Sequence, residues 1–520
     1  MIDLLLVRPW AWFTARLDAV LGRMTMYRLV VVVLGVVAAW SVVLGATGTL
    51  FFAPRDLLVS LAVAVTAAYV SNRLWSVLWR TPARGESALI TGLLLFFLMW
   101  PASDAKSLGL LAMAAAVATL SKFVLRWRGR HVFNPAALGA VVMMLTGLTG
   151  AVWWVATPSL LVPVLLGGLL VLRRTGRTVM ALVYVVVALA LTLWRLVDAG
   201  YGAGTAFSTA MGSYPLVFFA VFMLTEPLTL PGRRWQRLVE AVVVAVVASV
   251  PFTWHLGAVD IRTSPELALV VGNLLVLATG ARGLGRLEIV AQRDLAPGVR
   301  EVTLRPGTPR TFLPGQFLDV DVPHHGADSR GTRRTFSLTS APGEDLTIAF
   351  RVPERASSYK RALVTLEPGS AVRGTTVAGD FVLPHDPDVP LLLVAGGLGL
   401  TPFVSQLRSI AASGRPRDVV LVCSVSSPAE VLYADVLVAS GARVVVVSPG
   451  ARDELPVEAP VSWSFHPGRQ IPPELIGRVV HDAPQRAVYL SGPPAMVDAV
   501  RGSLRAAGVR RIRTDVFFGY

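Results

Sequence analysis

A glycine-rich segment in the C-terminal half has the composition of a phosphate-binding turn. It reads Gly396-Gly397-Leu398-Gly399-Leu400-Thr401-Pro402 and follows an apolar run, Leu391 to Ala395, that predicts a buried strand. A helical stretch comes after it. A strand-to-helix turn without side chains lets backbone N–H groups and the helix N-terminus contact a pyrophosphate. Such a turn alone is weak evidence for a nucleotide site.

Two further motifs flank this turn along the chain. Arg334-Thr335-Phe336-Ser337 precedes it and Ser491-Gly492-Pro493-Pro494-Ala495-Met496 follows it. In order and spacing, the three motifs resemble those of the ferredoxin–NADP reductase family, and the chain end Phe517-Phe518-Gly519-Tyr520 is similar as well. The resemblance covers residues 284–520 and implies an oxidoreductase that uses FAD and NADH or NADPH. An unstructured basic strand is the alternative interpretation of the Arg334 segment.

The resemblance also implies which side chains contact FAD. Arg334 would pair with an FAD phosphate, Phe336 would lie against the isoalloxazine ring, and Ser337 would hydrogen-bond near its N5 atom. Ser357-Ser358-Tyr359-Lys360 stands where the family binds the FAD pyrophosphate. Its lysine replaces the Thr or Ser that is common there and offers a point charge to a phosphate. A solvated lysine at a helix start is the alternative.

The positions that would receive NAD(P)H fall in the other two motifs. By resemblance they are Gly396, Gly397, Gly399, Thr401, Pro402, Gly492, Pro493 and Met496. Ser491 stands where many relatives have a cysteine beside the nicotinamide ring. Serine preserves size and hydrogen bonding, so hydride transfer should survive.

The chain end supplies the remaining catalytic candidates. In the family, an aromatic residue stacks on the flavin and gives way to nicotinamide, and Phe518 and Tyr520 are the candidates here. Ordinary core packing is the alternative. Asp515 stands where Glu is expected, which leaves a proton-relay role open.

Neither the coenzyme preference nor a role for the single cysteine follows from the sequence. Ser424-Val425-Ser426-Ser427-Pro428 contains neither an acid for a ribose hydroxyl nor an arginine for a 2′-phosphate. NADH and NADPH both stay open. Cys423 continues the apolar strand Val419 to Val422 and is interpreted as a core residue.

Two predicted domains position these motifs. Short β-rich runs such as Gly315-Gln316-Phe317-Leu318-Asp319-Val320, punctuated by Pro and Gly, predict an antiparallel β-barrel FAD domain over residues 284–386. Alternating strands and helices predict an α/β nucleotide-binding domain over residues 387–520.

The N-terminal half is too apolar for a surface that faces water. Of the 520 residues, 54% are hydrophobic and 16% are charged, and most long uncharged runs lie before residue 281. Because a span needs roughly 20 apolar residues, the pattern predicts a polytopic α-helical membrane domain of about ten spans over residues 27–283. The segments lie near 29–50, 56–72, 86–100, 106–125, 135–152, 156–172, 178–197, 211–228, 236–254 and 265–281.

The basic residues predict the orientation of these spans. With the N-terminus inside, the inner loops hold Arg73, Arg80, Arg84, Lys122, Arg126, Arg128, Arg130, Arg173, Arg174, Arg177, Arg233, Arg234 and Arg237. The outer loops hold Arg55, Lys106 and Arg262. The positive-inside rule then places the C-terminal FAD and NAD(P) domains in the cytoplasm. These loops explain the net charge of +15, so no nucleic-acid binding is expected.

The extreme N-terminus has a different pattern. Residues 1–26 are interrupted by Arg8, Arg16 and Arg23 and have no clear small-residue cleavage site. We expect an amphipathic cytoplasmic segment rather than a secretory signal.

Three polar segments interrupt the apolar half. They are residues 130–137 with Asn134 before Pro135, residues 222–229 with Glu226 before Pro227, and the glycine-rich loop 198–205. Helix capping by Asn134, a helix stop at Pro227 and a flexible loop are the alternatives to a binding role. With Ser87–Gly92, Ser121-Lys122 and Gly272-Asn273-Leu274, they resemble the flavin-carrying membrane subunits of the sodium-pumping NADH:quinone reductase and of the Rnf complex.

This second resemblance, over residues 56–281, implies a membrane flavin. The relatives carry FMN on a threonine in a Ser-Gly-Ala-Thr type motif on the outer side. Here Tyr201 replaces Ser and Gly204 occupies the flavin-bearing position, with Thr205 one residue later. Thr205 and Asn134 are the candidate FMN residues, and noncovalent FMN is favoured over covalent attachment.

Together the resemblances imply a multi-pass cell-membrane flavoprotein embedded in the lipid bilayer. Electrons would pass from NAD(P)H through FAD to a membrane flavin and on to an extracytoplasmic acceptor such as a flavoprotein. One cysteine cannot hold an iron–sulfur cluster. The membrane half has only two histidines, His131 and His255, and this small number argues against haem, which needs histidine pairs on facing helices. A quinone reductase and a redox-gated transporter remain alternatives, and no metal site is expected.

Overall fold

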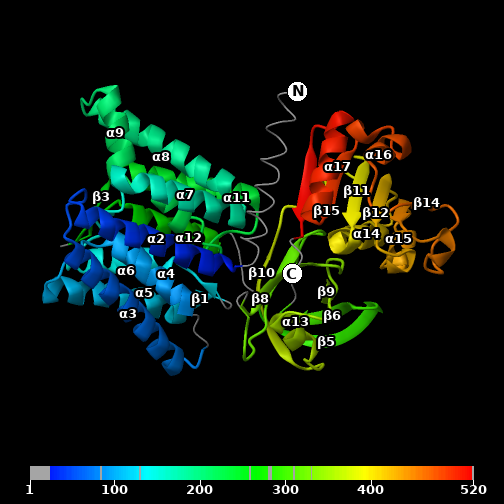
Figure 1. Cartoon of the computed structure of the whole chain (residues 1–520), viewed down its shortest axis with the longest axis horizontal. Coiled ribbons are helices and arrows are strands. Elements are labelled where there is room, and N and C mark those ends of the chain that lie inside the picture. Colours follow the sequence, from blue (N-terminus) through cyan, green and yellow to red (C-terminus); the bar gives the residue numbers. More distant parts are fainter. Residues whose placement is uncertain are drawn as a thin grey trace. The chain divides into compact units, whose positions relative to one another are not determined.

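The chain forms two compact units, residues 1–282 and 283–520. The computed structural model describes residues 24–81, 85–127, 130–256, 259–278, 284–308, 311–328 and 331–517. The N-terminal unit is built from helices, and the C-terminal unit from two sheets with their covering helices (Figure 1). Of the predicted amphipathic segment 1–26, all but the last three residues lie outside the described ranges.

Within the described part of the N-terminal unit, five helices are long and apolar enough to cross a membrane. They are α2 (Met26–Ala46), α3 (Pro54–Leu78), α5 (Ala105–Val124), α7 (Pro158–Thr175) and α8 (Thr178–Asp198). A bent pair raises the number to six: α9 (Ala203–Ser213) and the stretch Leu216–Met223 meet at an angle of 50°. Pro215 lies at the bend, where it interrupts the helical hydrogen bonds. The second stretch consists of α10 (Leu216–Phe218) and the π-helix η1 (Phe219–Met223).

The prediction of about ten spans is not supported, because four of the predicted segments contain helices that are too short. These helices are α4 (Gly85–Leu98), α6 (Pro135–Leu145), α11 (Arg234–Ser249) and α12 (Pro265–Ala278). They have 14, 11, 16 and 14 residues, whereas a full crossing takes roughly 20. Helix α6, for example, stops before Gly147, whose φ of 68° is left-handed. Apolar composition therefore continues beyond the point where the helix ends.

Small residues let the helices approach closely. Ala64, Ala68, Ala114 and Ala118 are fully buried. A Cβ added at Gly92 would lie 2.7 Å from the carbonyl oxygen of Ala64. Such contacts stabilise helix pairs where the hydrophobic effect between helices is weak. Two short hairpins complete the unit: β1 (Arg126–Trp127) with β2 (Arg130–His131), and β3 (Thr253–Leu256) with β4 (Val259–Arg262).

The first sheet of the C-terminal unit is antiparallel and six-stranded, in the order β8-β7-β10-β5-β6-β9. Its strands are β5 (Gly285–Ala296), β6 (Val299–Pro306), β7 (Phe317–Asp321), β8 (Arg333–Ser337), β9 (Leu346–Arg351) and β10 (Ala371–Ala378). The predicted barrel does not close in the described residues: edge strands β8 and β9 form no ladder, and just beyond β8 an isolated bridge joins Leu338 to Ile348, next to a hydrogen bond from the Thr339 N–H to the carbonyl of Thr347 at 2.9 Å. Helix α13 (Ser358–Val364) packs through Tyr359 and Leu363 onto the core of this sheet.

The second sheet is parallel, in the order β14-β13-β12-β11-β15-β16, as predicted for an α/β domain. Its strands are β11 (Leu391–Gly396), β12 (Val419–Ser424), β13 (Arg443–Ser448), β14 (Ser464–Pro467), β15 (Ala487–Gly492) and β16 (Ile512–Val516). Helices α14 (Thr401–Ser413) and α15 (Ala434–Ala439) cover one face, and α16 (Pro473–Val479) and α17 (Pro494–Ala506) cover the other (Figure 1). Cys423 is buried in β12, which confirms its interpretation as a core residue.

Buried hydrogen bonds join the two sheets. The Ser405 hydroxyl donates to the carbonyl of Ser340 at 2.7 Å, and the Gln406 amide donates to the carbonyl of Phe381 at 2.7 Å. The Tyr433 hydroxyl donates to Oε2 of Glu301 at 2.5 Å. These contacts fix the parallel sheet relative to the antiparallel sheet within the C-terminal unit.

Candidate functional site

The two glycine-containing motifs meet at the carboxyl edge of the parallel sheet. Strands β11 and β15 are neighbours, with Ala395 opposite Ser491. A Cβ added at Gly399 would overlap the carbonyl oxygen of Ser491 and lie 2.7 Å from Cα of Gly492. Only glycine at residue 399 permits this backbone contact. The turn then continues into α14 with the Thr401 hydroxyl donating to the carbonyl of Leu398 at 2.8 Å.

The remaining predicted positions of these motifs lie in the same place. A Cβ at Gly396 would overlap Sδ of Met496 and lie 3.1 Å from Cδ of Pro493. Gly397 adopts a φ of 53°, which a side chain would disfavour. Pro402 is buried at the start of α14. In α/β sheets, this edge is where dinucleotides bind, because helix N-termini and backbone N–H groups converge there.

Ser491 and Asp515 form the polar side of this edge. They are opposite each other in β15 and β16. Ser491 is fully buried, and within the described residues its hydroxyl has no hydrogen-bond partner. A buried hydroxyl without a partner costs about 1–3 kcal/mol, so it is suited to a ligand that supplies one. Burial raises the pKa of Asp515 from 3.8 to about 6.

This pKa predicts a pH dependence of stability. The folded chain binds the Asp515 proton more tightly than the unfolded chain, so the Asp515 contribution to the free energy of unfolding falls as pH rises from about 4 to about 6. We expect Asp515→Asn to gain stability relative to wild type over that interval. Thermal unfolding of the purified full-length protein at both pH values measures this gain. An offset between variant and wild type that is constant with pH would contradict it.

Arg334 and Ser358 converge on one anion. The Arg334 guanidinium is buried, lies 5.0 Å from the ring centroid of Tyr359 and donates to the carbonyl of Gly331 at 3.0 Å. Its Nη2 lies 3.5 Å from Oδ1 of Asp328, and Oδ2 of the same carboxylate accepts the Ser358 N–H at 3.2 Å. The Asp328 carboxylate shows that this donor set binds an oxyanion. An FAD phosphate is likewise an anion that accepts charge-assisted hydrogen bonds through its oxygens, so the residues fit it.

The other predicted FAD residues have definite places. Phe336 is 8% exposed and packs in the sheet core, with its ring centroid 5.5 Å from that of Phe350 and 6.0 Å from that of Tyr359. Ser337 is buried at the end of β8. Lys360 is buried as well, so the alternative of a solvated lysine is wrong. Phe518 and Tyr520 lie outside the described residues.

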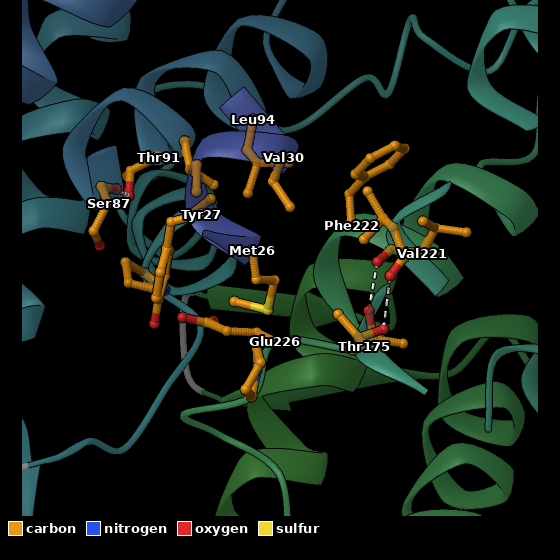
Figure 2. A pocket seen from close by; sticks show the side chains of 16 residues that line it. Met26, Tyr27, Val30, Ser87, Thr91, Leu94, Thr175, Val221, Phe222 and Glu226 are labelled. Atoms are coloured by element: carbon orange, nitrogen blue, oxygen red, sulfur yellow. Dashed lines mark hydrogen bonds between the residues drawn. The ribbon is translucent and has the colours of Figure 1, made fainter. Parts of the chain in front are cut away.

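A cavity in the N-terminal unit brings two of the predicted polar segments together. The volume of this cavity, including the part that opens to solvent, is about 560 Å³. Figure 2 shows apolar side chains such as Val30, Leu94 and Phe222 around it, with Ser87 and Glu226 also on its wall. Oε1 of Glu226 lies 2.7 Å from Nε2 of His131. Residues 130–137 and 222–229 therefore meet beside one cavity.

Lys122, predicted from the sequence as an inner-loop cation and as part of the Ser121-Lys122 motif, contacts Ser87 of this wall. Its ammonium donates to the carbonyl oxygen of Ser87 at 2.8 Å and to the hydroxyl of Ser87 at 3.0 Å. The hydroxyl of Thr91, one helical turn along α4, donates to the same carbonyl at 2.9 Å. The cavity is thus mainly apolar, with a few fixed polar groups, as is usual for sites that bind organic cofactors.

The two candidate FMN residues are not part of that wall. Asn134 is the N-cap of α6: its Oδ1 accepts the N–H of Ala137 at 3.1 Å, and its amide donates to the carbonyl of Met223 at 3.3 Å. The side chain of Asn134 thus caps a helix, which was the alternative to a binding role. Thr205 is exposed in the first turn of α9. Neither residue lines the cavity of Figure 2.

Comparison with known proteins identifies a domain family that matches the part of the chain forming the parallel sheet. Residues 393–502 match the family model of the oxidoreductase NAD-binding domain. The chain is 31% identical over 201 residues to the toluate 1,2-dioxygenase electron transfer component of Pseudomonas putida, covering 38% of this chain and 56% of that protein. It is 30% identical over 232 residues to the aromatic O-demethylase reductase subunit of Amycolatopsis, covering 43% and 66%.

Two solved structures are similar to part of the chain. A cytochrome P450 reductase from Amycolatopsis is 25% identical and matches 52% of this chain and 85% of its own, with a TM-score of 0.37. The FAD/NAD-binding domain of a nitric oxide dioxygenase from Vibrio cholerae is 20% identical and matches 45% and 98%, with a TM-score of 0.38. The chain spans between 56% and 66% of the length of the first three curated relatives it matches.

Proposed function

We propose that the chain, which carries an oxidoreductase NAD-binding domain at residues 393–502, is a membrane-bound flavoprotein that oxidises NADH or NADPH. The observation that carries this proposal is the packing of Gly399 onto the Ser491–Gly492 backbone at the carboxyl edge of the parallel sheet. A dinucleotide bound there would receive backbone N–H groups from the turn after β11. The Ser491 hydroxyl would face its nicotinamide end, with Asp515 beside it.

The antiparallel sheet would hold FAD. Arg334 and Ser358 would bind its phosphates in place of the Asp328 carboxylate, and buried Lys360 would add positive charge. Phe336 and Ser337, which follow Arg334 along β8, would border the isoalloxazine ring. FAD, when bound, accepts a hydride as an electron pair and releases electrons singly. The protein contributes the position of the two ligands, held by the hydrogen bonds that join the sheets.

The N-terminal unit would carry the electrons into or across the bilayer. Five apolar helices of sufficient length support membrane association. A cytoplasmic C-terminal unit stays a prediction from the distribution of basic residues in the sequence. Noncovalent FMN is the occupant we propose for the cavity beside Ser87 and Glu226, with electrons passing on to an extracytoplasmic acceptor. Covalent FMN at Thr205 is less well supported, since that side chain is exposed.

A quinone reductase is the second candidate. The same cavity favours it, because apolar walls with the fixed polar groups of Ser87 and Glu226 suit a lipid-soluble carbonyl compound as well as a flavin. The two candidates share the hydride-accepting half and differ in what receives electrons from it.

The flavin content of the purified protein tests the proposal. Full-length protein and a fragment of residues 284–520 are titrated anaerobically with NADH and with NADPH, and the flavin bleached per chain is counted. We expect one flavin in the fragment and two in the full-length protein. One flavin in both favours the quinone reductase, which oxidation by an added soluble quinone then checks. No bleaching in either overturns the proposal.

A further inference from the structure

A buried acid in the N-terminal unit has no role in the proposed electron path. Glu240 lies in α11, is 1% exposed, and sits six residues after Arg234, about 9 Å along the helix axis at 1.5 Å per residue. Among the described residues, neither of its carboxylate oxygens has a hydrogen-bond partner. An isolated buried carboxylate costs several kcal/mol or more, so such a site requires a compensating positive charge or a bound proton.

The surroundings of Glu240 include an opposite charge, that of Arg237, which makes no hydrogen bond to the Glu240 carboxylate oxygens within the described residues. The groups that act on its carboxyl are Arg237 on the same helix and the side-chain amide of Asn273 on α12. The acid of α12, Glu266, is held elsewhere, with its Oε2 accepting from the Trp153 indole at 2.9 Å. On α8, the charged Arg195 bonds the carbonyl of Ser249 at 3.0 Å, at the opposite end of α11.

A metal ion does not fit this place. Hard cations such as Ca²⁺ take about six to eight oxygen ligands, and Glu240 supplies two. The nearest amide oxygen, Oδ1 of Asn273, already accepts the N–H of Asn134 at 2.8 Å. No group of three or more His, Cys, Asp or Glu that would hold a metal occurs in the described ranges. A proton is the occupant that needs no further ligands.

A route for that proton leads through Asn273. Its amide nitrogen is also buried without a partner in the described part of the chain, and the residue lines a second cavity of about 290 Å³ together with His131. His131 bonds Glu226, which lines the cavity of Figure 2. Polar groups therefore continue from Glu240 by Asn273 and His131 to Glu226, and the cavity that Asn273 and His131 line has space for water.

We propose that Glu240 is a proton-exchange site of the N-terminal unit, connected by Asn273 and His131 to the Glu226 carboxylate. In the exchange, the O–H bond of the Glu240 acid breaks, the proton leaves through the cavity lined by His131, and a proton returning the same way forms the bond again. No electrons move in this step. Uptake of one proton compensates one electron that enters the unit, and this role rests on the proposed function.

Infrared spectroscopy of the purified full-length protein tests the site. We expect wild type to show the carbonyl stretch of a protonated carboxylic acid that shifts when H₂O is replaced by D₂O. Glu240→Gln should lose that band, and Glu240→Asp should keep an exchangeable band at a changed frequency. Glu266→Gln is the matched control, a buried acid with a hydrogen-bond partner, and should keep the Glu240 band. Persistence of the band in Glu240→Gln, or no exchangeable acid band in wild type, overturns the proposal.

Two further readouts separate the route and the role. His131→Ala should slow the deuterium exchange of the Glu240 band several-fold, and unchanged exchange overturns the route. Reduction by dithionite, which bypasses NAD(P)H, should change the band in wild type and in Glu266→Gln. A band that exchanges but ignores reduction overturns the compensating role. Deuterium exchange does not require flavin in either unit, so failure of the proposed function is recognised separately by the flavin count.

Discussion

Gly399→Ala is expected to lower the rate of FAD reduction by NAD(P)H by about 10²-fold, the cost of misplacing reacting groups by about 1 Å. The added Cβ would overlap the carbonyl oxygen of Ser491, which is backbone and cannot rotate away. Strand β15 and the turn after β11 must then separate. That separation displaces the Ser491 hydroxyl and the N–H groups of the turn together.

Anaerobic stopped-flow reduction of the FAD absorbance measures this effect. Gly502→Ala in α17 is the matched control: apart from its chain neighbours and the nearby backbone of its own helix, no atom of the described structure lies within 4 Å of a Cβ there. Alanine should stabilise that helix by up to about 1 kcal/mol and leave the reduction rate unchanged. A Gly399→Ala protein that reduces FAD at the wild-type rate would contradict the placement of the dinucleotide at this edge.

Arg334→Ala is expected to weaken FAD binding by about ten- to hundredfold, since a charge-assisted hydrogen bond contributes about 1.5–3 kcal/mol. The guanidinium is held in place by the Tyr359 ring and the carbonyl of Gly331, so its removal takes a fixed, charged donor out of the site. Titration of the deflavinated protein with FAD, followed by flavin fluorescence, gives the dissociation constant.

Arg305→Ala serves as the control for this variant. Arg305 is an arginine of the same sheet, pairs with Asp345 at 2.9 Å and has a side chain that is 54% exposed. A surface pair of this kind contributes about 0–1 kcal/mol, so FAD binding should stay as in wild type. Equal FAD affinity in Arg334→Ala and wild type would remove Arg334 from the phosphate site.

The strand-turn-helix around Gly399 could be predicted because all of its signals are local. An apolar run, three glycines and a following helical stretch define β11 and the start of α14 without reference to distant residues. The closed barrel was wrong for the opposite reason. Although β8 and β9 follow each other in the chain, whether they form a ladder depends on the curvature of the whole sheet, and in the described residues an isolated bridge joins Leu338 to Ile348.

The span count failed because hydropathy measures composition and not helix length. The predicted segment 211–228 contains the bend at Pro215, and 135–152 continues past the end of α6 at Leu145. Glu240 was missed because its neighbours Val239 and Ala241 are ordinary helix residues, and its contact with Asn273 comes from another helix. Polar residues that come together only in the folded protein have no characteristic spacing in the sequence by which they could be predicted.

The hydrogen bond between Tyr433 and Glu301 has a consequence for how the C-terminal unit unfolds. Glu301 lies in β6 of the antiparallel sheet, and Tyr433 precedes α15 of the parallel one. Arg293 also donates to Glu301, at 2.6 Å. Melting of the parallel sheet would take the Tyr433 donor from the buried Glu301 carboxylate, and melting of the antiparallel sheet would leave the Tyr433 hydroxyl without its acceptor. Melting one sheet therefore lowers the stability of the other. The two sheets, although separate in topology, should behave as a single cooperative block.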